Sequence, residues 1–99
     1  MIQHTVVFTL VHEPGSPAEA EFLTAARRDL GALPGVGEFT VHRQVSVKSP
    51  GSWQFSMVFA DQEAYDAYDA HPVHRGFVAD RWAREVAEFH EFDFVRWDG

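Results

Sequence analysis

The residues best suited to chemistry in this sequence lie in one short segment, from Tyr68 to His74. An imidazole changes its charge near neutral pH, so His74 could take a proton from a carbon that lies between two carbonyl groups. The Tyr68 hydroxyl could donate a hydrogen bond to the enolate oxygen formed in that step. The alternative, which we weigh above the catalytic one, is that Pro72 and the histidines only join two helices, with His74 hydrogen-bonded in the core and Tyr68 packed against the sheet.

The same segment contains a possible metal-binding pair. His71 and His74 have the His-x-x-His spacing, and imidazoles one helical turn apart can ligate zinc, nickel or iron. Asp69 is close in the sequence, but Pro72 interrupts the helical register and no third ligand is fixed. We therefore expect no metal site and no cofactor.

The elements that must position these residues begin with four strands. Hydrophobic and polar residues alternate with a period of two from Ile2 to Leu10, Glu38 to Val47, Trp53 to Phe59 and Glu88 to Trp97. A turn-rich stretch from Lys48 to Ser52 joins the second strand to the third, which predicts a hairpin.

Two helical regions separate the strands. Ser16, Pro17 and Glu19 predict a helix start in which the Ser16 side chain caps the helix and the Glu19 side chain reaches back to complete a capping box. Asp61 is the expected N-cap of the next helix, which Pro72 breaks before it opens a further helix. That last helix places three residues on one stripe with Phe77 beside them: His74, Val78 and Trp82.

The order strand, helix, strand, strand, helix, strand predicts an α+β protein with the ferredoxin-like split βαβ plan. We expect a four-stranded antiparallel sheet with its helices on one side, in a single domain over residues 1–99. Val7, Val58 and phenylalanines of the last strand then leave apolar side chains on the uncovered face. Such a face usually marks an interface, so we expect a twofold homodimer joined sheet to sheet.

Composition restricts the partners. The net charge is −7, Lys48 is the only lysine and the arginines are scattered, which argues against nucleic acid and against an anionic membrane surface. There is no cysteine for a disulfide or a thiolate nucleophile, and no stretch approaches the ~18 apolar residues of a membrane span. We expect a cytoplasmic protein.

Several short motifs resemble one known family, the stress-responsive dimeric α+β barrel or Dabb domain, along nearly the whole chain. The most specific is the Tyr-x-x-His-Pro-x-His-x-x-Phe pattern from Tyr68 to Phe77. The resemblance implies a ferredoxin-like protomer that pairs into a dimeric barrel and has a cleft between its sheet and its helices. The other motifs that carry it are Ile2 to Phe8, Leu33 to Val36, Phe59 to Asp61 and Phe92 to Phe94.

The resemblance also implies site residues. A few relatives are cofactor-free cyclases of polyketide-like substrates, in which a tyrosine and a histidine act together, and those positions match Tyr68 and His74. A first-strand histidine that lines the cleft matches His4. Trp53 stands where these relatives have a smaller or more polar group, which argues against a large polyketide substrate.

We therefore expect a homodimer that binds a small, mostly apolar or aromatic ligand, with no reaction known for most of the family. The alternative is a cofactor-independent cyclase or lyase with His74 and Tyr68 as the catalytic acid–base pair. Quinone-forming monooxygenases and haem-degrading proteins of the same plan use asparagine at the cleft, and this sequence has none. The expected ligand-binding residues are His4, His71, Trp53, Phe77 and Trp82.

Overall fold

Strand β1 (Ile2–Leu10) lies inside the sheet of the computed structural model, which describes residues 1–99. Its neighbours are β3 (Trp53–Phe59) and β4 (Val86–Phe94), and β2 (Gly37–Arg43) lies at the outer edge of β3. The strand order is β2-β3-β1-β4 and every pairing is antiparallel. The predicted ferredoxin-like fold is confirmed.

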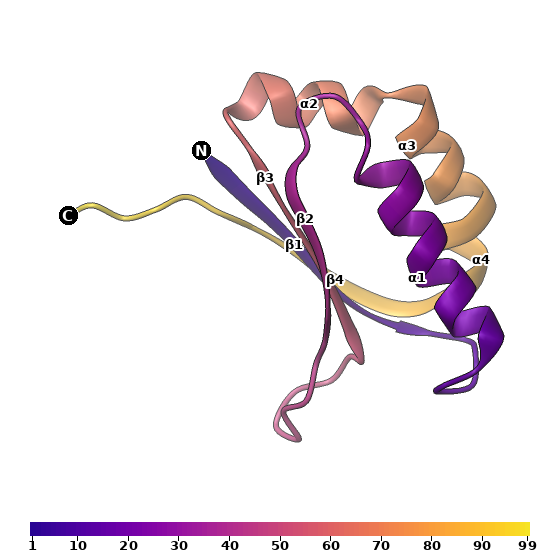
Figure 1. The fold of residues 1–99 in the computed structure, drawn as a ribbon. Helices are drawn as coiled ribbons and strands as arrows, with labels where there is room; N and C mark the ends of the chain where they lie inside the picture. Colours follow the sequence, from indigo (N-terminus) through magenta and orange to yellow (C-terminus); the bar gives the residue numbers. More distant parts are fainter.

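All helices cover one face of this sheet (Figure 1). Helix α1 (Pro17–Leu30) connects β1 to β2, and α2 (Gln62–Ala70) follows β3. A further helical stretch is continuous through α3 (Pro72–Phe77), a π-helical turn η1 (Val78–Trp82) and α4 (Ala83–Glu85). None of these helices has the length and apolar character that crossing a membrane requires.

The core lies between the sheet and the helices and is built largely from aromatic rings. Alternation along β1 and β3 turns Phe8 and Phe55 toward the helices, where Phe22 of α1 meets them with ring-centroid distances of 6.1 and 6.5 Å. Phe22 also contacts Phe77 at 5.6 Å and Trp82 at 6.2 Å, so its ring joins both helical segments to the sheet. The largest fully buried side chains are Phe8, Phe22, Phe55, Phe59 and Met57.

The helix starts form largely as predicted, with one difference at α1. Ser16 Oγ accepts the Glu19 backbone N–H, as expected of an N-cap. The Glu19 carboxylate does not return to Ser16, because the Ser16 N–H already donates to the Glu13 carbonyl. It accepts instead from the Gly15 N–H at 2.9 Å and from the Trp53 indole at 3.1 Å, which satisfies a buried carboxylate.

The remaining caps are as predicted. Asp61 Oδ1 accepts the Ala64 N–H at 2.9 Å at the start of α2, and Pro72 is the first residue of α3.

Two strands have bounds that differ from the sequence prediction. The second strand ends at Arg43 rather than at Val47, because the Gln44 side chain donates to the backbone carbonyls of Ser49 and Gly51 and closes the following segment into a loop. Val47 is fully exposed in that loop. The last strand runs from Val86 to Phe94, whereas the sequence pattern predicted Glu88 to Trp97.

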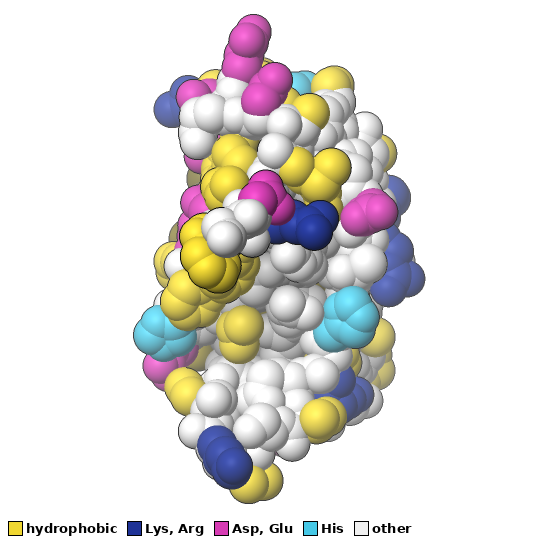
Figure 2. Space-filling view, turned by 90° about the vertical axis from the view of Figure 1, so that its left-hand side faces the viewer, with side chains coloured by type: hydrophobic (Ala, Val, Ile, Leu, Met, Phe, Trp, Pro, Cys, Tyr) yellow, Lys and Arg dark blue, Asp and Glu magenta, His cyan; other side chains and the backbone are white.

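The face of the sheet opposite the helices, here called the outer sheet face, is open to solvent. Hydrophobic side chains gather along one side of it (Figure 2). Phe92 and Phe94 of β4 are 48% and 53% exposed there, with their rings stacked at 6.1 Å. Val7 lies beside Phe92 in a shallow hollow of the same face and is half-buried.

Candidate functional site

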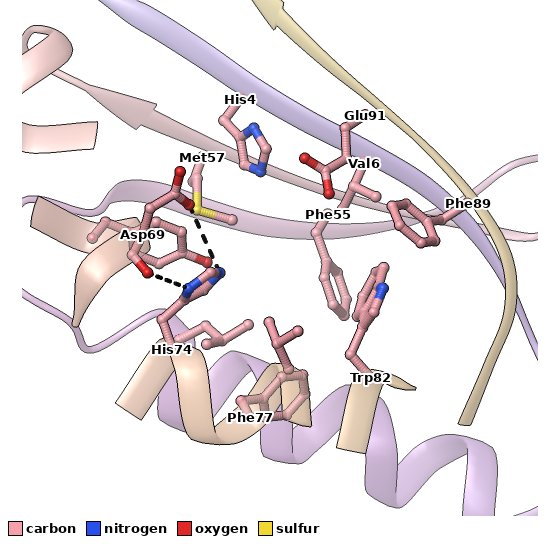
Figure 3. Close-up of a pocket in the computed structure, with 13 residues that line it drawn as sticks. His4, Val6, Phe55, Met57, Asp69, His74, Phe77, Trp82, Phe89 and Glu91 are labelled. Atoms are coloured by element: carbon pink, nitrogen blue, oxygen red, sulfur yellow. Dashed lines mark hydrogen bonds and ion pairs between the residues drawn. The ribbon is translucent and has the colours of Figure 1, made fainter. Parts of the chain in front are cut away.

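A cavity of about 210 Å³ lies between the inner face of the sheet and the helices that follow β3 (Figure 3). Its wall is mostly hydrophobic, with two histidines and two carboxylates among the aromatic and aliphatic side chains. The lining residues are His4, Val6, Leu30, Phe55, Met57, Tyr68, Asp69, His74, Phe77, Val78, Trp82, Phe89 and Glu91.

Strand register brings the two polar strand residues of the wall, His4 and Glu91, to this cavity. His4 pairs with Met57 of β3, and Val6 pairs with Glu91 of β4, so inward-facing positions of three adjacent strands share one wall. The opposite wall comes from α2, α3 and η1, where helical spacing aligns His74 with Val78.

Tyr68 and His74 meet on the helical wall, with ring centroids 4.4 Å apart. The His74 Nδ1–H donates to the Asp69 backbone carbonyl at 3.1 Å, which fixes the orientation of the ring. With the proton on Nδ1, Nε2 of the neutral imidazole is a free acceptor, and it lies 4.0 Å from the Asp69 carboxylate. The geometry is that of a positioned base beside a phenol.

The Tyr68 hydroxyl has no hydrogen-bond partner in the protein, although the residue is only 3% exposed. No polar side-chain atom that is fully enclosed lacks a partner, so this hydroxyl opens onto the cavity whose wall it helps to form. Burial raises the pKa of Tyr68, and the nearby Asp69 and Glu91 carboxylates act in the same direction. The hydroxyl therefore keeps its proton and can donate it in a hydrogen bond to a bound molecule.

His4 belongs to a network that the sequence analysis missed. Its Nδ1–H donates to Asp93 Oδ1 at 2.6 Å, and the Tyr65 hydroxyl donates to Asp93 Oδ2 at 3.0 Å. The same hydroxyl lies 2.9 Å from His4 Nδ1. Because Nδ1 is held by the carboxylate, the neutral imidazole has Nε2 as its acceptor. Burial, followed by the hydrogen bond to Asp93, raises the pKa of Tyr65.

Asp93 and Glu91 could have been noticed as the polar members of the inward-facing set on the last strand. Their pairing with β1 depends on a contact between residues almost a whole chain apart, which a local pattern does not encode.

The structure brings five of the seven predicted site residues to the cavity: His4, Tyr68, His74, Phe77 and Trp82. Trp53 lies outside it, because its indole donates to Glu19 and the Arg43 guanidinium covers its ring at 4.4 Å. His71 also lies outside, where its Nδ1 accepts the Val73 N–H and caps α3. No group of three or more histidine, aspartate or glutamate side chains is placed to share a metal ion.

The fold and the site together define a class: a ferredoxin-like α+β protein with a largely apolar cavity between its sheet and its helices, and with two histidines and two carboxylates on the cavity wall. The profile of the stress responsive A/B barrel domain family, Dabb, matches residues 2–96. The chain belongs to this family, which confirms the resemblance seen in its motifs.

Solved structures agree with this assignment. A Dabb family protein with a ferredoxin-like fold from Mesorhizobium loti is 49% identical, with a TM-score of 0.96 over 97% of this chain and 96% of the other. A dimeric ferredoxin-like protein of unknown function from Thermobifida fusca is 18% identical, with a TM-score of 0.74 over 96% and 90%. SnoaB, a cofactor-independent oxygenase from Streptomyces nogalater, is 19% identical, with a TM-score of 0.71 over 99% and 94%. The last two show the shared fold alone. The comparison with curated proteins gave no match.

Proposed function

We propose that this protein is a homodimer that binds a small, mostly apolar ligand in the cavity of each protomer. The observation that carries the proposal is the wall itself, in which hydrophobic side chains surround the unpaired hydroxyl of the buried Tyr68. Ligand sites are typically apolar pockets with a few converging polar groups. We still predict that the protein is cytoplasmic.

The outer sheet face supports the homodimer. Phe92 and Phe94 are half-exposed on this face, and an apolar face of this kind is typical of an interface. Fold neighbours from Thermobifida fusca and Bacteroides fragilis are described as dimeric. A twofold axis would place one outer sheet face on the other and leave the cavity, on the inner face, free in both protomers.

Cavity size limits the ligand. An apolar cavity of about 150 Å³ is large enough to hold benzene. The cavity here measures about 210 Å³, so it suits a single ring with a short substituent. Its two imidazoles and the Tyr68 hydroxyl would then meet polar atoms of that substituent.

Ligand binding is tested by the melting temperature in the presence of small aromatic probes such as benzyl alcohol. A ligand present at a hundred times its Kd stabilises the native state by about 2.7 kcal/mol, so we expect a rise of several degrees. Val78→Trp fills the cavity from the helical wall and should abolish the rise. Val73→Trp, on the exposed side of α3, is the matched control and should keep it. If no single-ring probe raises the melting temperature, the proposed function is wrong.

A second candidate function is favoured by the contact between Tyr68 and His74. A cofactor-independent cyclase or lyase needs a base for a carbon acid and a donor for the enolate oxygen. Nε2 of His74 can act as that base, because Nδ1 is held by the Asp69 carbonyl, and the Tyr68 hydroxyl can act as the donor. His4, held by Asp93, is a second imidazole that can orient the substrate.

For this second candidate, we expect His74→Ala to slow turnover of a poly-β-keto substrate by about 10²–10⁴-fold, the usual contribution of a general base. Tyr68→Phe keeps the ring and removes only the donor, so it should also slow the reaction. His71→Ala is the control, because His71 lies in the same segment but outside the cavity. Equal rates for the unchanged protein and His74→Ala would exclude this chemistry.

A further inference from the structure

The cavity wall has a single sign of charge. Asp69 and Glu91 carry carboxylates, and no lysine or arginine lines the cavity. Both residues are exposed, so they lie at the mouth, and Figure 3 shows the Glu91 side chain turned toward the cavity. Glu91 lies on the inner face of β4, opposite Val6, so pairing of two outer sheet faces would not cover it. A ligand that enters the cavity therefore passes two negative charges.

The interior beyond these carboxylates is aromatic. Phe55 and Phe77 are 1% and 6% exposed, and Trp82 packs edge to face on the half-exposed Phe89 with their centroids 5.5 Å apart. Aromatic side chains pack favourably against the ring of a bound molecule, edge to face or offset and stacked. Five rings line the cavity in all: Phe55, Tyr68, Phe77, Trp82 and Phe89.

Glu91 is the carboxylate that is free to act on a ligand. The Asp69 carboxylate lies 4.0 Å from Nε2 of His74, whereas the side chain of Glu91 forms no hydrogen bond or ion pair with the rest of the chain. Burial is the main cause of the raised pKa of the Tyr68 hydroxyl on this wall, and the negative charges of Asp69 and then Glu91 add to it. A bound anion would meet the same repulsion, while a bound cation would relieve it.

We propose that the cavity takes a small aromatic amine in its cationic form, with the ring among Phe55, Phe77 and Trp82 and with the ammonium group at Glu91. The inference rests on the proposed function and narrows its ligand class. Tyr68 supplies the second polar contact, because its hydroxyl faces the cavity without a partner in the protein. Glu91 is the residue that determines specificity.

Three probes of nearly equal shape test the proposal by titration calorimetry: benzylamine, benzyl alcohol and benzoate. We expect the unchanged protein to bind benzylamine most tightly and benzoate least. Glu91→Gln keeps the shape of the side chain and removes its charge, so benzylamine should bind about fivefold more weakly, which is the scale of a solvent-accessible ion pair. The affinity for benzyl alcohol should change by less than twofold.

Glu88→Gln is the matched control, since Glu88 lies on the same strand but outside the cavity, and it should leave all three affinities unchanged. Of the three probes, only benzylamine should bind more weakly when the salt concentration is raised. The inference is overturned if the unchanged protein binds benzyl alcohol as tightly as benzylamine. It is also overturned if Glu91→Gln still prefers the amine to the same degree. Either result leaves the proposed function standing. Failure of all three probes to bind overturns both.

Discussion

Substituting Phe92 by glutamate is expected to leave the protein a monomer, with a mass near that of one 11.2 kDa chain. Phe92 is 48% exposed on the outer sheet face and stacks on Phe94. In a twofold interface the same patch serves both protomers, so one substitution introduces two carboxylates that must be desolvated together. The chain already carries a net charge of −7, which adds to their repulsion.

Light scattering during size-exclusion chromatography measures this change directly. The unchanged protein should give twice the mass of one chain, and Phe92→Glu should give the mass of one. Val73→Glu provides the control, because Val73 is similarly exposed but belongs to the helical layer. A dimeric Phe92→Glu variant, or an unchanged protein that is already monomeric, contradicts an interface formed by the outer sheet face.

Much of the fold could be predicted because local patterns determine it. Period two in Ile2–Leu10 and Trp53–Phe59 marks strands with one buried face, and both strands have the predicted bounds. The pattern failed beyond Arg43. Valines continue to alternate there, but the Gln44 side chain donates hydrogen bonds to backbone carbonyls of the following loop. Hydrophobic periodicity cannot reveal this competition between strand pairing and the loop, because the loop depends on the hydrogen bonds of one polar side chain.

The candidate site could be predicted only in part, for a related reason. His74, Val78 and Trp82 share a helical stripe, which spacing alone reveals, and all three line the cavity. Asp93 was missed as the partner of His4, because their contact depends on how β1 and β4 align. Trp53 was expected in the cleft, yet the buried Glu19 carboxylate holds its indole elsewhere.

Phe22→Ala is expected to lower the free energy of unfolding by about 3–5 kcal/mol, the usual cost of truncating a phenylalanine in a packed core. The side chain is fully buried and its ring contacts Phe8, Phe55 and Phe77. Alanine leaves a void between helix and sheet that rigid aromatic neighbours fill poorly. Because small domains are stable by only about 5–15 kcal/mol, the loss is a large share of the total.

Urea unfolding followed by circular dichroism measures the loss, with Val47→Ala as the control, since Val47 is fully exposed and its truncation should change stability by less than about 0.5 kcal/mol. A loss below about 1 kcal/mol for Phe22→Ala would mean that the core closes around the void. Phe22 does not line the cavity, but Phe77 and Trp82 do, and both contact the ring of Phe22. The same variant should therefore bind benzyl alcohol more weakly even under conditions in which it remains folded, because the aromatic wall loses the support that holds its rings in place.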